Sequence, residues 1–394
     1  MIGFVEVITL LLGLAGFGLQ PNPRPATPDQ ALQYAIADAD IVVHLDVASV
    51  VPGNFQALLA LPNQPQIKAS PELAKVVKQV LAEVEGARGM AKTSTGIDLA
   101  TDITDATLFV QIVPGGGDPN AIASVRGKLP MSVIDKIGKM TKKQPSKVGG
   151  GMMLELGGKD PAIAITKDGV MLAGTPKLVR ERLADGWKSP PRAANTALGY
   201  AQDMIGGKPV FGAVFTPSVN ARKELLAKLG PKKNFLTDLA QRHKLFTISV
   251  FHDGIGWTWL DTTKAGLDQM ALMSEGAIEL LRASHIAPRG VAKIALGALE
   301  SYKGTDKRID EILKRKADLM KVVESYTGDG NFKAAVTKDV TKLRLDVRAT
   351  GKTFSEVVPL GFVAPAAGVL LLGRATVTPP PPPTAVTPAQ PRKQ

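Results

Sequence analysis

Alternating apolar and polar positions recur along this chain and predict short paired strands. The segment 161–174, PAIAITKDGVMLAG, places two alternating runs around Thr-Lys-Asp, which predicts a hairpin. The segment 332–347, FKAAVTKDVTKLRLDV, has the same arrangement about 170 residues later. Both segments are therefore expected to form strand pairs that turn at Thr-Lys-Asp.

A second pair of landmarks has a similar spacing. DIVVHLDVASVV, near Asp40, and KPVFGAVFTPSV, near Lys208, each indicate a strand that runs into a helix. The segments between the landmarks do not keep the offset, because DATLFVQIVP would match HKLFTISVFHDG at a shorter spacing. Two matched landmarks nevertheless predict a duplicated unit with insertions.

The complete pattern predicts a mixed chain in which strands outnumber crossover helices. In the first half it indicates strands at 41–48, 106–113, 121–128, 151–156, 161–166 and 169–174, and helices near 53–60, 71–92, 131–143 and 176–185. In the second half it indicates a strand at 209–216, hairpins at 245–262 and 332–349, and helices at 218–229, 234–243, 264–284, 291–301 and 305–325. The expected fold class is α+β, with two tandem repeats of antiparallel sheet and helices packed on one face.

Proline-rich and polar stretches divide the chain into segments. Pro190 and Pro191 interrupt DGWKSPPRAANT, which places the boundary between a first repeat at 36–188 and a second at 189–352. Residues 20–35 are expected to be a linker, and the proline-rich tail 374–394 is expected to be an extended polyproline segment.

Two apolar runs lie outside these repeats. Residues 1–19, MIGFVEVITLLLGLAGFGL, precede a proline-rich stretch and indicate a signal peptide or N-terminal anchor, although no Lys or Arg precedes the run. Residues 357–373 are just long enough for a membrane-spanning helix, which Pro365 would kink. The alternatives are a buried N-terminal helix for the first run and a core-packed helix or strand pair for the second. Taken as membrane segments, the runs predict an exported, periplasmic or cell-envelope protein that is associated with a membrane.

Three segments resemble uncharacterised exported bacterial proteins that contain two repeated α/β units, a domain of unknown function. The resemblance is carried by TSTGIDLATDIT at 93–104, by ASVRGKL leading into a helix, and by TKDGVMLAGTPKLVRERL, in which a hairpin leads into a helix. It covers most of residues 35–350. The resemblance implies a location and a fold, and it provides no catalytic activity that could be carried over to this chain.

Composition excludes several classes of chemistry. The 394 residues include no cysteine, which removes disulfides, thiolate nucleophiles and cysteine metal sites. Aromatic residues make up 5%, too few for an extensive base-stacking surface. The formal charge of +12 favours contact with anionic lipid or polymer, although a basic solvated surface also explains it.

Local motifs identify no catalytic residue, no metal site and no cofactor. ATGKTF at 349–354 contains the Gly-Lys-Thr of a phosphate-binding loop, but Asp346 stands where the first glycine is needed. Only four histidines occur, and none lies in a His-Glu-x-x-His arrangement. His44 and Asp46 could share one face of a strand, where a buried histidine paired with a carboxylate is the ordinary outcome.

One lysine-rich stretch is the candidate binding site. KIGKMTKKQPSK displays five lysines on a predicted helix and its exit loop, and these are the anion-binding candidates: Lys136, Lys139, Lys142, Lys143 and Lys147. A solvated helix face is the alternative, and sequence-specific nucleic-acid binding is not expected because arginine clusters and exposed aromatics are missing.

The sequence therefore favours a non-catalytic, membrane-tethered envelope protein that acts as a binding or scaffold module. Its expected partners are anionic lipid, an envelope polymer or an unidentified protein. The alternative is a hydrolase-type enzyme whose active site is assembled from distant residues without a local motif.

Overall fold

A computed structural model describes most of the chain between residues 26 and 351. The described residues are 26–49, 101–157, 160–230, 235–301, 316–351 and scattered positions within 78–98 and 303–314. The apolar runs at 1–19 and 357–373, the tail at 374–394 and most of the helices expected near 53–60 and 71–92 lie outside these residues.

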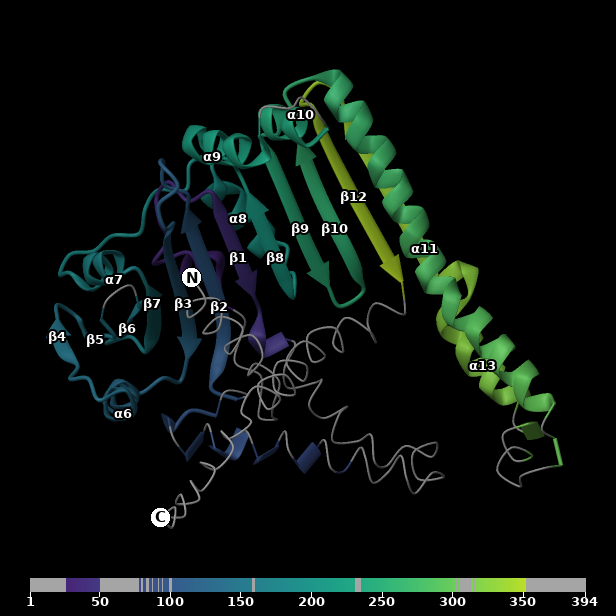
Figure 1. Cartoon of the computed structure of the whole chain (residues 1–394), viewed down its shortest axis with the longest axis horizontal. Coiled ribbons are helices and arrows are strands. Elements are labelled where there is room, and N and C mark those ends of the chain that lie inside the picture. The colour runs from purple at the N-terminus through teal and green to yellow at the C-terminus, as the bar shows by residue number, and fades with distance from the viewer. Residues whose placement is uncertain are drawn as a thin grey trace, which may run out of the picture.

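One antiparallel sheet of twelve strands forms the centre of the molecule (Figure 1). Its order is β11-β12-β10-β9-β8-β1-β2-β3-β7-β6-β5-β4. The strands of the first half are β1 (Ile41–Leu45), β2 (Ile103–Gln111), β3 (Asn120–Gly127), β4 (Ser146–Val148), β5 (Gly151–Glu155), β6 (Ala162–Thr166) and β7 (Val170–Gly174). Those of the second half are β8 (Phe211–Phe215), β9 (Leu245–Phe251), β10 (Gly254–Leu260), β11 (Phe332–Asp339) and β12 (Arg344–Gly351). Because β1 pairs with β8, the sheet continues across the expected boundary near residue 189.

Eight α-helices are described, and several of them begin at a capping hydroxyl group. They are α2 (Pro28–Ala31), α6 (Ser132–Thr141), α7 (Pro176–Leu183), α8 (Ala197–Gly206), α9 (Val219–Leu229), α10 (Phe235–Arg242), α11 (Lys264–Glu300) and α13 (Lys316–Thr327). The hydroxyl groups of Thr196, Ser218 and Thr263 accept backbone N–H bonds in the first turns of α8, α9 and α11. The structure is thus a mixed α+β fold built on a large antiparallel sheet, which confirms the coarse part of the expected fold class.

Helices cover both faces of the sheet, and the expectation of helices on one face is wrong. One core cluster combines Ile122 of β3 with residues of α2, α7 and α8. A second cluster combines Val125 of the same strand with Val133 and Ile134 of α6. Since Ile122 and Val125 are an odd number of residues apart, they point to opposite faces. A sheet with both faces apolar needs helices on both sides.

Two local expectations are corrected. The first hairpin turns at Lys167 and Asp168, but in the second, Thr337, Lys338 and Asp339 are still part of β11, and the chain turns only after them. The helices expected at 264–284 and 291–301 form the single helix α11, which continues through Pro288.

The expected transmembrane helix is also corrected. No helix among the described residues combines the length and the apolar character needed to cross a membrane. The 37-residue helix α11 is long enough, but charged residues are distributed along it.

Candidate functional site

Three of the five candidate lysines meet at the end of α6. Lys139 lies in the last turn, and Lys142 ends the helix in the left-handed conformation, with φ of 55°. The N–H of Lys143 then donates to the carbonyl oxygen of Gly138 at 2.9 Å, so the chain reverses tightly over the helix end. A side chain at Gly138 would collide with the Lys143 carbonyl oxygen, which explains glycine at this position.

This reversal creates an open depression of about 610 Å³. Its lining is mostly polar or charged and consists of Asp135, Gly138, Lys139, Lys142, Lys143, Gln144, Pro145 and Met152. The three lysines are exposed, and none of them forms an ion pair with another described residue. Three ammonium groups against one carboxylate leave the depression with net positive charge.

The other two candidate lysines do not line the depression. Lys136 is half-buried on α6, and its ammonium group lies against Gly96. Lys147 is exposed on β4, the strand at the edge of the sheet. The structure therefore brings together Lys139, Lys142 and Lys143 and places Lys136 and Lys147 beside them along the chain.

Sequence reasoning missed a second, smaller cleft of about 170 Å³ near α7. Arg182 is buried in its wall, with its guanidinium 4.4 Å from the ring centroid of Trp187. Its Nη2 donates to the carbonyl oxygen of Ala35 at 3.0 Å, and its Nη1 pairs with Glu181 at 2.9 Å. Burial lowers the pKa of Arg182, and these contacts compensate its charge. No motif marks this arginine, because the Ala35 carbonyl oxygen that accepts its buried hydrogen bond comes from a distant segment.

Asp105 of β2 is the most perturbed acid among the described residues. Its side chain is fully buried, and neither carboxylate oxygen has a hydrogen-bond partner. Burial raises its pKa to about 7, although Arg126, opposite it on β3, favours the charged form, and Asp46 adds to the increase. Asp105 does not line either cleft.

The pairing considered for His44 and Asp46 does not form. Nδ1 of His44 lies 3.0 Å from the hydroxyl oxygen of Thr107, while the Asp46 carboxylate accepts the backbone N–H of Ser49 at 3.1 Å. Burial lowers the pKa of His44 to about 4, so the imidazole is neutral at pH 7. No group of three metal-ligating side chains exists among the residues described.

The structure around Asp346 does not support a phosphate-binding loop at ATGKTF. Asp346 lies inside β12, where its carboxylate accepts hydrogen bonds from Thr258 at 2.6 Å and from Nε of Arg344 at 2.6 Å. These bonds fix Asp346 as part of the strand surface. Lys352 and Thr353 lie outside the described residues.

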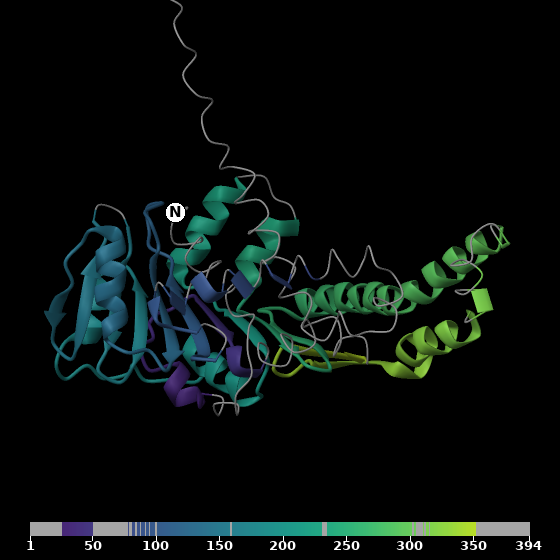
Figure 2. The same ribbon diagram turned by 90° about the horizontal axis from the view of Figure 1, so that it is seen from below.

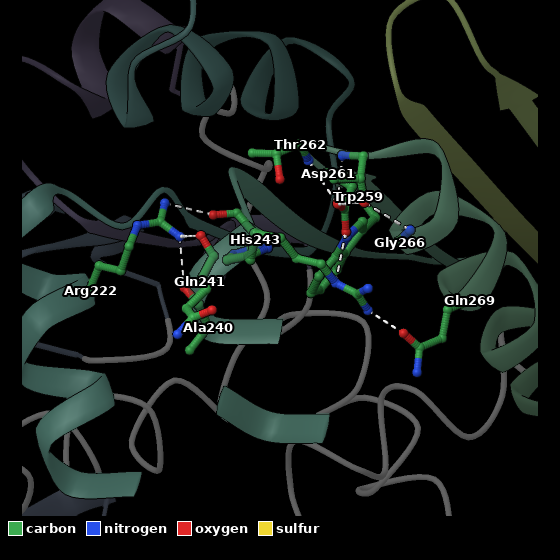
Figure 3. A network of polar contacts seen from close by, with 11 residues as sticks. Arg222, Ala240, Gln241, His243, Trp259, Asp261, Thr262, Gly266 and Gln269 are labelled. Carbon is green, nitrogen blue, oxygen red and sulfur yellow. Dashed lines mark hydrogen bonds and ion pairs between the residues drawn. The ribbon is translucent and has the colours of Figure 1, made fainter. Parts of the chain in front are cut away.

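Figure 3 shows a further buried polar network at the end of β10, which has a structural role. The Asp261 carboxylate accepts the backbone N–H groups of Thr262 at 2.7 Å and Thr263 at 3.0 Å, and it lies 3.4 Å from Nε of Arg242. A side chain at Gly266 would overlap this carboxylate. The network therefore holds the start of α11 against the sheet.

Arg222 of α9 performs a similar task for α10 in the same view (Figure 3). Its guanidinium donates to the carbonyl oxygens of Ala240, Gln241 and His243 at 2.7, 2.5 and 2.8 Å. Ala240 and Gln241 lie in the last turn of α10, where carbonyl groups have no partner within the helix, and His243 follows the helix end. The ring of His243 stacks on Phe215 and lies tilted against Trp259. Burial lowers the pKa of His243 to about 4, with Arg222 adding to the effect.

Comparisons with protein-family models, with curated proteins and with solved structures find no match to this chain.

Proposed function

We propose that the protein is a non-catalytic binding module for anionic polymers or anionic surfaces. The observation that carries this proposal is the convergence of Lys139, Lys142 and Lys143 on one open depression. An exposed depression with several flexible ammonium groups suits a repeating anion, because such groups bind as point charges without a fixed geometry. The formal charge of +12 adds long-range attraction to the same ligands.

Binding is favoured over catalysis by where the perturbed groups lie. Asp105, His44 and His243 have the largest pKa shifts among the described residues, and all three are buried. None of them lines either of the two clefts. A catalytic acid or base must come within hydrogen-bond distance of its substrate, which these positions do not support.

A quadruple substitution tests this function. Replacing Lys139, Lys142, Lys143 and Lys147 by Gln is expected to weaken binding to vesicles of equal parts phosphatidylglycerol and phosphatidylcholine. A lysine near an anionic surface contributes about 1 kcal/mol, so loss of the three lining lysines should reduce affinity about a hundredfold. The measurement is vesicle co-sedimentation over a salt series, repeated with polyglutamate to distinguish a lipid surface from a soluble polymer.

The matched control makes the same change of charge elsewhere. Four exposed lysines lie away from the depression, and their replacement by Gln lowers the net charge equally: Lys177, Lys188, Lys244 and Lys264. This variant is expected to keep most of the binding. Equal losses in the two variants would show that net charge alone attracts the ligand, and equal retention would contradict the site.

We also propose that the body consists of two repeats that meet at the β1–β8 pair. The strand order supports this, since β2, β3, β7 and β6 follow β1 in one direction, while β9, β10, β12 and β11 follow β8 in the other. Superposition of these two sets of strands in a crystal structure is expected to match both order and direction. A reversed direction in any matched strand would contradict the duplication.

A location in the cell envelope is the third part of the proposal. It is supported by the apolar composition of residues 1–19 and by the proline-rich stretch that follows them. A reporter that is active only outside the cytoplasm, fused after Lys352, is expected to be active. Activity of a cytoplasmic reporter alone at the same position would contradict this location.

A further inference from the structure

The long helix α11 has one face in the core and extends past the sheet with α13 as an arm (Figures 1 and 2). Leu267, Ala271 and Ile278 are buried against strands β10, β11 and β12. Its 37 residues span about 55 Å at 1.5 Å per residue. The opposite face has no partner among the described elements from Leu272 to Ile294, whereas Gln269, nearer the N-terminus, accepts a hydrogen bond from Arg242 of α10.

That opposite face is apolar. Leu272, Leu280 and Ile294 are 70%, 72% and 75% exposed, and Met273 is also exposed. Met273, Leu280 and Ile294 are separated by multiples of seven residues, so they follow one line along the helix. Large apolar side chains in such a line are typical of a helix that packs against a second helix.

Small residues follow the middle of the same face at the same spacing. Gly276, Ala283, Gly290 and Gly297 occur every seven residues. A Cβ at any of the three glycines would meet no atom within 4 Å, so nothing in the single chain requires glycine there. Glycine weakens a helix relative to alanine, whereas it allows the backbone of a second helix to approach closely.

The charges along this face indicate the direction of the second helix. Glu275 and Glu279 lie along the N-terminal part of one edge of this face and Lys293 follows them, whereas the guanidinium of Arg282 turns toward the sheet, over the ring of Phe332. Glu279 and Arg282 form an ion pair at 3.0 Å within the helix, whereas Glu275 and Lys293 have no ion-pair partner among the described residues. In an antiparallel copy, Glu275 of one chain lies near Lys293 of the other, so unlike charges that have no partner in the single chain meet.

We propose that this face binds α11 of a second copy of the chain, antiparallel, around a twofold axis at Ala283. Gly276 of one copy then lies opposite Gly290 of the other, and Leu272 lies opposite Ile294. The small residues allow the helices to approach closely, and the large residues cover them on both sides. The same surface is used by both copies, which closes the assembly as a dimer.

The first test measures the mass of the full chain in solution by light scattering over a concentration series. The parent is expected to have twice the mass of one chain. Gly276→Leu combined with Gly290→Leu adds side chains where the single chain has open space, so this variant is expected to fold and to be a monomer. Gly206→Leu on α8, where a Cβ also meets nothing within 4 Å, is the control and should remain a dimer.

A parent protein that is monomeric at all concentrations would overturn the proposal. A monomer that binds vesicles through this face would also overturn it. A dimer that survives both leucines would overturn this interface. Circular dichroism of the double variant verifies its fold, and Leu280→Glu, at an exposed position, provides a second disruption if the leucines cause aggregation.

The absence of cysteine from the chain permits a sharper test of register and direction. Ala283→Cys places two thiols beside the twofold axis and is expected to give a disulfide-linked dimer under mild oxidation. Gln269→Cys and Gly297→Cys should each fail to cross-link alone, and a mixture of the two should cross-link. Cross-linking of either variant alone would indicate parallel helices and overturn the antiparallel arrangement.

Discussion

Asp105 is expected to lower the free energy of unfolding of the parent protein as pH rises from 5 to 8, and Asp105→Asn is expected to abolish this decrease. The folded-state pKa is about 7, above the ordinary value of 3.8. Between these values the unfolded chain has released the proton and the folded chain still holds it, so raising the pH favours unfolding. Well below the folded-state pKa, each pH unit changes the free energy of unfolding by about 1.36 kcal/mol. The slope falls as Asp105 ionises near pH 7, so the rise from pH 5 to pH 8 gives about 3 kcal/mol.

Two histidines affect the same range with the opposite sign. Burial lowers the pKa of His44 and of His243 to about 4, below the ordinary value of 6.5. Their unfolded forms bind protons that the folded forms reject, so they add stability as pH rises from 4 to 6.5. The parent's own pH profile is therefore a sum, and the difference between parent and variant isolates Asp105.

Urea unfolding of parent and Asp105→Asn at pH 5 and pH 8 measures this difference. Asparagine resembles the protonated acid in shape, so the two proteins should have similar stability at pH 5. At pH 8 the variant should be the more stable. Parallel profiles would mean that Asp105 is ionised throughout, compensated by Arg126, which lies opposite it.

Much of the element list could be predicted from alternation and caps alone. β6 and β7 were expected at 161–166 and 169–174, and they span Ala162–Thr166 and Val170–Gly174. Such hairpins are local, so neighbouring residues determine them. The prediction that the helix ends at 284 and a new one begins at 291 was wrong, because Pro288 disturbs only nearby hydrogen bonds of α11. Burial of Leu267 and Ile278 anchors the part of α11 before that proline to the sheet.

The sites were less predictable than the elements. The lysines at the end of α6 are close in sequence, so their meeting follows from one helix and its exit loop. Arg182 and Asp105 depend on long-range neighbours, such as the Ala35 carbonyl and Arg126, which no spacing rule provides. Burial of a charged group is a property of the assembled sheet, and a single sequence contains no local sign of it.

Replacing Asp40 by Ala is expected to lower the free energy of unfolding by about 2–4 kcal/mol, since two backbone N–H groups lose hydrogen bonds to a charged, buried acceptor. Asp40 is fully buried just before β1. Its Oδ2 accepts the N–H of Ile112 at 2.7 Å, and its Oδ1 accepts the N–H of Ser218 at 2.7 Å. One carboxylate thus joins the end of β2 to the start of α9, across the pair where the two halves of the sheet meet.

Asp38 provides the control for this prediction, because it lies two residues earlier and is exposed. Asp38→Ala removes the same charge and should change stability by less than about 0.5 kcal/mol. Asp40→Asn should give an intermediate loss of stability. The amide keeps one acceptor oxygen but directs an NH₂ group at the other backbone N–H, so at least one hydrogen bond is lost. Urea unfolding of the three variants at pH 7 separates these contributions. A loss for Asp40→Ala no larger than that for Asp38→Ala would show that water replaces the carboxylate, and that the junction between the halves depends on β1–β8 pairing alone.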